Sequence, residues 1–456
     1  MKEKGCCIRS PWIRRSLFRW RSAMLEPTDE EQRLLDLLTA DYWDKESERR
    51  GLRGVKLHSS KLTESGVVAT LELTGRDGLK ELRQKHSTVR VMLDVLDNDL
   101  TDLTPGGRAS KVLFSVRTRY ITDELDMLWH PGITTLGRDT VTGEEVDVPR
   151  DQRLLVGGSS GSGKSWSTRA LMARAVVHPD EELGHFIDGK GEESIWWRKV
   201  CKCAITHEEI IDAIEYEYAV MEERAARMQK EGTGVWNFEW GPRRLVVIDE
   251  GYSVLCAVIE EDKRRGKVPK GEDDYVFTEG PNKSLMQKLT ELSSQGRTRE
   301  VILMWMTQNP LRSGDDRGIT SAIRTNFDYS FCLRVNTQEN TETVLGKGAG
   351  VEPHNLPRGN RFRGYGYLNT HGPNLLRTWT VTNEMIPLLA YPDHGRGRWP
   401  RDVALKTLGS QPGVLWTADL LASHTGCGRV QAGCFLRSFS REGLVSAEGE
   451  RYRLIA

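Results

Sequence analysis

One run of eight residues combines the types and the spacing that phosphate binding requires. It reads Gly158-Ser159-Ser160-Gly161-Ser162-Gly163-Lys164-Ser165, after an apolar strand-like stretch and before a helical one. Glycines in such a loop allow backbone N–H groups to approach phosphate oxygens, and the following helix contributes the positive end of its dipole. We therefore expect the whole run to bind ATP, with Lys164 on the β- and γ-phosphates and Ser165 on Mg²⁺.

A pair of adjacent carboxylates, Asp249 and Glu250, follows the apolar run Leu245–Ile248. Open α/β sheets bind ligands at the carboxyl ends of their strands, so we expect these acids near the phosphate loop. Asp249 is expected to orient Mg²⁺, and Glu250 is expected to act as the general base that polarises the attacking water. An apolar strand that ends in an acid is common by itself, and the phosphate loop upstream makes this one informative.

Two further polar groups surround another apolar run, Val301–Met306. Gln308 follows the run, and we predict that it senses the γ-phosphate, with an ordinary strand-ending turn as the alternative. Arg297 and Arg299 precede the run, where an arginine could reach the ATP of a neighbouring subunit and stabilise charge in the transition state. The alternative for these arginines is a solvated surface position.

An α/β domain is needed to bring these groups together. Between Gly137 and Asn383, short apolar runs alternate with longer helical segments, which predicts a doubly wound domain with a parallel sheet covered on both faces. The charged stretch Glu260–Asn282 interrupts this rhythm and is predicted to be an exposed insertion loop. The expected strands are Leu154–Val156, His185–Ile187, Leu245–Ile248, Val301–Met306 and Tyr329–Val335.

The N-terminal part is predicted to hold a small α+β domain behind a basic tail. The tail, Lys2–Arg21, is expected to be disordered, with contact to an anionic membrane or to nucleic acid as the alternatives. Asp29–Arg50 has the apolar face of a helix. The small domain is expected to contain strands Val67–Leu73, Val89–Val95 and Val112–Arg117 and a helix at Gly78–Lys85.

The C-terminal segment follows a Gly-Arg-rich linker, His394–Pro400, and has the pattern of a winged helix. Helix Thr417–His424, a turn, helix Arg429–Glu442 and a terminal hairpin are expected in that order. We predict that it binds DNA, and a protein-interaction module is the alternative. The candidate DNA contacts on its second helix are Arg429, Gln431, Arg437 and Arg441.

Composition limits the other possibilities. The chain has 456 residues with 65 basic and 65 acidic side chains, so a nucleic-acid partner has to be held by a local basic surface. The 8 cysteines form neither a metal-ligand pattern nor a disulfide framework, which indicates reduced thiols in a cytoplasmic protein. No apolar run approaches the roughly 18 residues of a membrane span.

Together these residues resemble the FtsK/SpoIIIE DNA translocases from about Val55 to the C-terminus. The approach to the phosphate loop is similar, and so is the arginine Arg297 ahead of a strand that ends in Thr-Gln-x-Pro. Gly189 departs from the family pattern, which usually has a proline there. The other matching elements are Leu136–Asp139, Ile187–Gly191, Met221–Arg224, Ile323–Asn326, Val344–Gly346 and Leu356–Gly359.

The resemblance implies an ATPase with a RecA-like P-loop motor, assembled as a hexameric ring around double-stranded DNA. It assigns the arginine that acts between subunits to Arg297 rather than Arg299, and the DNA-orienting role to the winged helix. The lack of a membrane-spanning region favours a relative of the transfer proteins of actinobacterial conjugative elements. The implied organisation is tail and lead-in 1–50, small α+β domain 51–135, motor 136–393, linker 394–408 and winged-helix-like domain 409–456.

Two other functions use the same nucleotide chemistry. A coupling or packaging ATPase would act on single strands or on protein. An ATP-gated DNA-binding regulator would use the winged helix as its output, although a switch has no need of the hydrolytic residues Glu250 and Gln308.

Overall fold

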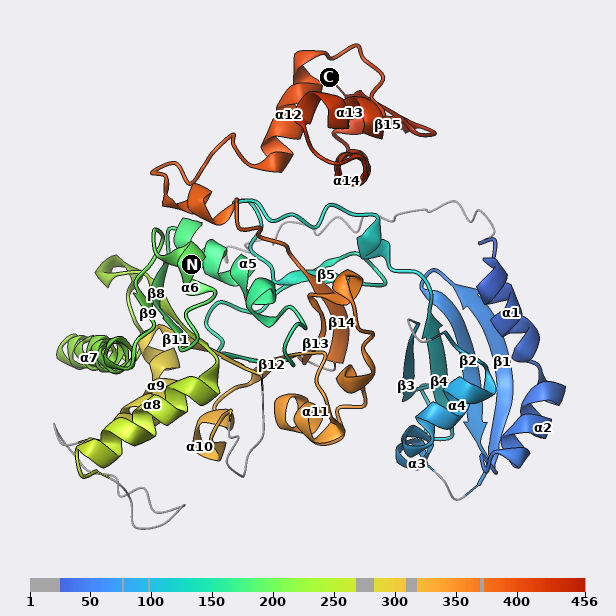
Figure 1. The fold of residues 1–456 in the computed structure, drawn as a ribbon, viewed down its shortest axis with the longest axis horizontal. Helices are drawn as coiled ribbons and strands as arrows, with labels where there is room; N and C mark the ends of the chain where they lie inside the picture. The colour runs from blue at the N-terminus through green and yellow to red at the C-terminus, as the bar shows by residue number, and fades with distance from the viewer. Residues whose placement is uncertain are drawn as a thin grey trace, which may run out of the picture.

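Three units make up the described part of the chain (Figure 1). The computed structural model describes residues 25–75, 78–96, 99–267, 283–308, 318–369 and 373–455. A small α+β domain precedes a large α/β domain, and a C-terminal helical module with a hairpin follows. The fold class predicted from the sequence is therefore confirmed. The basic tail, for which the sequence predicts disorder with membrane or nucleic-acid contact as alternatives, lies outside the described residues.

The small domain is an antiparallel sheet of order β1-β2-β4-β3 with helices packed on it. Leu34 and Trp43 of the first two helices are fully buried in its core beside Val67 and Phe114, so the helical lead-in belongs to this domain. Its elements are α1 Asp29–Leu37, α2 Ala40–Arg49, β1 Val55–Thr63, β2 Gly66–Leu73, α3 Leu79–Gln84, α4 His86–Met92, β3 Leu100–Pro105 and β4 Lys111–Arg117.

One predicted strand of this domain is wrong. Val89–Val95 was expected to be extended, but the chain forms helix α4 there and places the missing strand at β3. Val89, Met92 and Leu93 are buried while Val91 is 64% exposed, which is the spacing of a helix face. The run is rich in β-branched residues and is too short for its sequence to distinguish the 3.6-residue period of a helix from the two-residue period of a strand.

The large domain is built on a ten-stranded sheet of order β6-β5-β14-β13-β12-β7-β11-β10-β8-β9. The strands from β12 to β9 are parallel, and the other four extend the sheet in antiparallel pairs. All five strands expected in this region are present. The bounds are β5 Gly137–Asp139, β6 Glu145–Val146, β7 Leu154–Gly157, β8 Glu181–Asp188, β9 Cys203–Ala204, β10 Arg243–Asp249, β11 Val301–Thr307, β12 Tyr329–Leu333, β13 Tyr365–Asn369 and β14 Pro373–Thr378.

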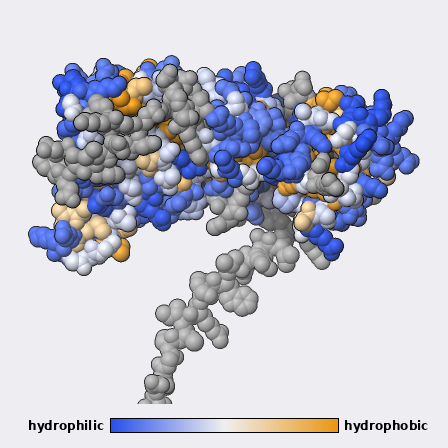
Figure 2. Space-filling view, turned by 90° about the horizontal axis from the view of Figure 1, so that it is seen from below, coloured by the Kyte–Doolittle hydropathy of each residue, from blue (hydrophilic) through white to orange (hydrophobic). Residues whose placement is uncertain are grey.

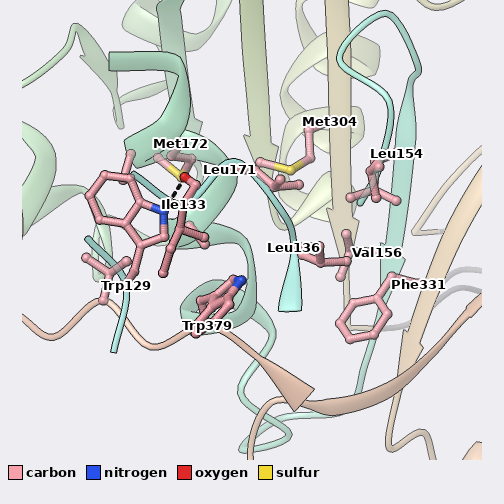
Figure 3. Close-up of a cluster of buried hydrophobic side chains, with 14 of the residues drawn as sticks. Trp129, Ile133, Leu136, Leu154, Val156, Leu171, Met172, Met304, Phe331 and Trp379 are labelled. Carbon is pink, nitrogen blue, oxygen red and sulfur yellow. Dashed lines mark hydrogen bonds between the residues drawn. The ribbon is translucent and has the colours of Figure 1, made fainter. Parts of the chain in front are cut away.

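Separate apolar cores lie on the two faces of this sheet. The core drawn in Figure 3 contains Leu171 and Met172 of helix α5, Leu154 and Val156 of the sheet, and Trp129. The other core packs helices α7, α8 and α9 on the opposite face. The helices are α5 Lys164–Val177, α6 Ser194–Trp197, α7 His207–Lys230, α8 Gly251–Arg264, α9 Leu285–Gln295, α10 Ser321–Arg324 and α11 Gln338–Leu345.

The predicted insertion loop is only partly tested. Its first residues, from Glu260 to Arg264, are the last turn of α8 rather than a loop, because that helix buries Glu261 and Asp262 at its end. Asp262 accepts backbone N–H groups of Leu285 and Met286 at the start of α9. Residues 268–282 lie outside the described part.

The C-terminal module begins earlier than predicted. Residues 394–408 were expected to form a linker, but Pro400 starts a helix that buries Ala404 and Leu408 beside Trp416 and Phe435. A proline at the first helical position favours the start of a helix. The sequence prediction instead assigned this proline to the linker, because the residues before it are rich in glycine and arginine. The module consists of α12 Pro400–Ser410, α13 Ala418–Thr425, α14 Arg429–Arg441, β15 Val445–Glu448 and β16 Arg451–Leu454.

The hydropathy of the helices and of the surface bears on whether the described ranges contain a membrane-spanning helix. None of the helices there combines the length and the apolar composition needed to cross a membrane. The face of the molecule drawn in Figure 2 is largely hydrophilic, with apolar residues scattered over it.

A buried ion-pair cluster fixes helix α7 to strands β8 and β10. Glu217 is fully buried and accepts hydrogen bonds from His185 Nδ1 (2.6 Å) on β8 and from Arg244 Nε (2.6 Å) on β10. Burial alone would raise the pKa of Glu217, but the hydrogen bonds from His185 and Arg244 outweigh it and hold the pKa at about 2. The carboxylate therefore stabilises the folded domain only while it is ionised.

We expect Glu217→Gln to lower the free energy of unfolding by about 2–3 kcal/mol at pH 7. Since the pKa of Glu217 is lower in the folded chain than in the unfolded one, this contribution is complete above about pH 4.5 and is lost as the pH falls toward 2. Denaturant unfolding from pH 7 to pH 3 should show the deficit shrinking below pH 4.5. Glu223→Gln, an exposed position on the same helix, is the control. A deficit that does not change with pH would contradict the assignment.

Candidate functional site

The phosphate loop connects β7 to α5 and is held by backbone bonds to both neighbouring strands. Gly158 N–H donates to Thr307 O (3.2 Å), and Ser159 N–H donates to Arg334 O (2.8 Å) beyond the end of β12. Gly163 has φ +92°, and a side chain on it would lie 2.8 Å from the backbone nitrogen of Gly364. Only glycine fits there, because both the left-handed conformation and the contact exclude a Cβ. The loop therefore reaches the first turn of α5 in one fixed shape.

Asp249 lies at the centre of the site. It is 5% exposed, and its two oxygens accept hydrogen bonds from Lys164 Nζ (2.6 Å) and Ser165 Oγ (2.8 Å). The parallel register places Thr307 beside Gly157 and Asp249 beside Asp188, so these strands end in line. The structure thus brings together three of the residues singled out in the sequence.

Glu250 occupies a strained position directly after Asp249. Its φ is +70°, a left-handed conformation that costs a residue other than glycine on the order of 1–3 kcal/mol. Its oxygens lie 3.1 Å from Lys190 Nζ and 3.5 Å from the backbone nitrogen of Gln308. Gly251 follows, and a Cβ there would overlap the indole of Trp305. The tight turn therefore points the Glu250 carboxylate into the cavity beside the phosphate loop.

The loop that carries Lys190 is organised by Asp188. This buried carboxylate accepts backbone N–H groups of Gly191 (3.0 Å) and Ser194 (2.9 Å). Gly189 lies against α8, and a Cβ there would be 2.6 Å from Cβ of Ser253. This contact explains why glycine stands where the resembling family has proline. The sequence identified the element but not the contact between Lys190 and Glu250, which depends on the pairing of β8 with β10.

A cavity of about 610 Å³ opens beside the phosphate loop, a volume in the range of small-molecule sites. Lys164, Ser165, Asp249, Glu250 and Gln308 are part of its lining. The lining also contains charged residues that were not predicted from the sequence, Asp123, Arg361, Arg363 and Arg377. The cluster of arginines and glycines between Arg358 and Gly364 is a signal that could have found Arg361 and Arg363.

The residues around Asp249 fit a magnesium ion. Ser165 and Asp249 offer a hydroxyl and a carboxylate oxygen 2.8 Å apart, and Mg²⁺ prefers such hard oxygen ligands. In the described ranges, no group of three or more His, Cys, Asp or Glu residues could hold a metal ion. Two protein ligands suit Mg²⁺, because this ion usually keeps positions for waters and phosphate oxygens.

Arg297 is far from the phosphate loop of its own chain. It lies in the 3₁₀ turn η4 Gly296–Arg299, just before β11, and pairs with Asp151 (3.1 Å) and Asp328 (3.7 Å). The loop follows the opposite end of the adjacent strand, roughly 20 Å away by the rise of a seven-residue strand. Arg297 therefore cannot reach a nucleotide bound to its own loop.

The four candidate DNA contacts of α14 do not share one exposed surface. Arg429 is exposed and pairs with Asp419 (3.1 Å). Gln431 and Arg437 instead contact a segment whose Leu125 and Met127 pack in the core of the large domain. There Gln431 Nε2 donates to Asp126 Oδ1 (3.0 Å), and Arg437 Nε donates to Glu124 O (2.7 Å). Arg441 lies beside the turn at Gly143 of the same domain. Burial raises the pKa of Asp126 to about 6.

Comparison with known proteins identifies relatives of the chain. No protein-family model matches it. It is 32% identical to protein Tra of Streptomyces lividans over 336 residues, 73% of this chain and 52% of Tra, and is homologous to it. It is 22% identical to the uncharacterized protein L437 of Acanthamoeba polyphaga mimivirus over 213 residues, 45% of this chain and 60% of that protein. The chain thus spans little more than half the length of these relatives.

Among solved structures, the conjugation coupling protein TcpA of pCW3, in its monomer form with ATPγS, is similar at a TM-score of 0.46. The match has 14% sequence identity and covers 76% of this chain and 96% of TcpA.

Proposed function

We propose that this chain, a homologue of the Streptomyces Tra protein, is an ATP-hydrolysing motor of the FtsK/SpoIIIE type that moves double-stranded DNA. The observation that carries the proposal is the convergence of Lys164, Asp249 and Glu250 at the ends of parallel strands beside one cavity. In a glycine-rich turn without function there is no reason for the lysine to pair with a buried carboxylate, as Lys164 does with Asp249, or for a strained glutamate such as Glu250 to follow that carboxylate.

The residues divide the chemistry of phosphoryl transfer among them. The N–H groups of the loop and Lys164 would bind the phosphates, after Lys164 leaves Asp249 for the ligand. Ser165 and Asp249 would hold Mg²⁺, which supplies charge neutralisation of the phosphate oxygens when bound. Glu250 would accept a proton from the attacking water, while Lys190 and Gln308 fix the position of its carboxylate. The strained turn favours this role, since strain is commonly stored at catalytic positions.

Double-stranded DNA, a hexameric ring and a role in element transfer are inferred from the resemblance to the FtsK/SpoIIIE proteins and from the homology with Tra. The winged-helix-like module adds an element of a kind that often binds duplex DNA. Since the whole chain carries no net charge, such binding would depend on local basic surfaces.

The test is the response of ATP turnover to nucleic acid. We expect Glu250→Gln to bind ATP like the wild type but to hydrolyse it at least about 100-fold more slowly, because the base is lost while the phosphate contacts remain. Lys164→Ala should abolish turnover, because the phosphate loop loses the ammonium group that binds the phosphates. Wild-type turnover should rise with duplex DNA and with its length. Stimulation by single strands alone would favour a coupling or packaging ATPase, and a length-independent response would favour a regulator.

The position of Arg297 predicts that it acts on the neighbouring subunit. Arg297→Ala should bind ATP and lose activity, and mixing it with Lys164→Ala should restore part of the activity. Restoration is expected because one kind of mixed interface keeps both an intact loop and an intact arginine. Arg299→Ala, which loses only a surface pair with Glu222, is the matched control. Mixed assemblies without any restored turnover would remove this role.

A further inference from the structure

The loop from Gly359 to Gly364 is attached to the phosphate loop. It contains the 3₁₀ turn η6 Asn360–Phe362, and its last residue donates a backbone hydrogen bond from Gly364 N–H to Ser162 O (3.2 Å). A Cβ built on Gly163 would be 3.3 Å from Cβ of Arg363, so this arginine starts beside the last glycine of the phosphate loop. Arg363 is exposed and lines the cavity. Any ligand on the phosphate loop is therefore next to it.

The cations around the cavity differ in whether they have an acidic partner. Lys164 pairs with Asp249 (2.6 Å) and Lys190 with Glu250 (3.1 Å). Arg361 and Arg377 both pair with Asp123, at 2.8 Å and 3.1 Å. The guanidinium of Arg363, in contrast, makes no hydrogen bond or ion pair with any residue that the structure describes.

We propose that Arg363 binds the phosphate chain of the nucleotide within the same subunit, in addition to Lys164. A guanidinium presents a planar set of donors that matches phosphate oxygens, and one without an acidic partner loses no ion pair when it binds them. Its attachment to Ser162 keeps it in place relative to the loop. The proposal rests on the proposed ATP site and adds to it a contact from the loop Gly359–Gly364.

The test compares two arginines of one loop. Arg363→Ala should raise the Kd for ATPγS and for ADP at least tenfold, measured by calorimetry, and should leave adenosine binding unchanged. Arg358→Ala removes the same charge from an exposed position outside the cavity lining, and its Kd values should stay within twofold of the wild type. Arg363→Lys should give an intermediate Kd, because it keeps the charge without the planar donors.

Two results would overturn the proposal, and both differ from a failure of the ATP site. Equal Kd values for Arg363→Ala and Arg358→Ala would show that Arg363 makes no contact with the ligand. An equal loss of adenosine and ATPγS binding would place Arg363 on the base instead of the phosphates. If the wild type itself bound no ATPγS, the proposed function would fail.

A different observation concerns the C-terminal module, which is docked on the large domain through helix α14 and through Arg401 of α12, which pairs with Asp126 (3.8 Å). In Figure 1 α14 is the part of the module nearest to that domain. Gln431 and Arg437 contact the segment from Glu124 to Asp126, and Ser438 Oγ accepts the backbone N–H of Asp126 (2.9 Å). Asp126 is 4% exposed, so its side chain is buried in this contact.

We infer that the docked module is a closed state, in which α14 is held away from DNA and from which it is released by duplex DNA. In the docked state the side chains of Gln431 and Arg437 are hydrogen-bonded to the large domain. The side chain of Arg429 and the apolar side chain of Val430, 78% exposed at the start of α14, remain accessible. Release would free a continuous polar face of the helix for a groove or for phosphates.

Asp126 allows release without changing α14. Asp126→Ala removes the acceptor of Gln431, and hydrogen exchange should then show lost protection in residues 123–128, which contact α14 in the docked state, with no DNA present. The same variant should bind duplex DNA at least fivefold more tightly at fixed salt. Glu144→Ala, an exposed acid of the same domain, controls for the simple loss of negative charge. Ser438→Ala is a second, milder release variant.

The inference is overturned if Asp126→Ala and Glu144→Ala have the same duplex affinity, or if residues 123–128 keep their protection in both release variants. Hydrogen exchange is measured without DNA, so its result tests the closed state even if the proposal that the chain moves DNA fails.

Discussion

The parallel register of β8, β10, β11 and β7 is the constraint on which the rest of the site depends. Asp188, Asp249, Thr307 and Gly157 are brought into line by backbone hydrogen bonds alone, although they are spread over 150 positions of the chain. A shift of one residue in any of these pairings would turn the side chains to the other face of the sheet. The buried carboxylate of Glu217 bonds both β8 and β10 to α7, and so stabilises the register of these two strands.

At the turn that contains Glu250, the packing of the core determines the direction of a candidate catalytic side chain. The indole of Trp305 on β11 occupies the space where a Cβ of residue 251 would lie, and its Nε1 donates to Gly318 O (3.0 Å). Helix α8 must therefore begin with glycine directly against the sheet, and Glu250 is left in a left-handed conformation between strand and helix. A less strained turn would direct the carboxylate elsewhere, so the core residue Trp305 positions the candidate base without touching the cavity.

The sequence predicted the parts of the site that are contiguous in the chain and missed those that only folding brings together. The phosphate loop and Asp249 carry their own pattern of glycines, apolar residues and charge. The pairing of Lys190 with Glu250 does not, because it requires neighbouring strands to be known. Arg363 was missed for the same reason, since its loop meets the phosphate loop only across the sheet. The helix at Val89 was mistaken for a strand because a seven-residue run is too short to define its period.

The sheet separates two functional ends in one subunit. The phosphate loop, Asp249 and Glu250 lie where β7 and β10 finish, and Arg297 lies where β11 begins, paired only with acids near its own end. Such an arrangement cannot place both groups on one nucleotide within a single chain. A head-to-tail contact places the arginine end of one copy against the phosphate end of the next, and repeated contacts of this kind close into a ring when the rotation allows. Arg363 is held on the phosphate loop of its own chain and is available before any neighbour arrives. Binding and turnover would then draw on different arginines, Arg363 from within the subunit and Arg297 from the next one.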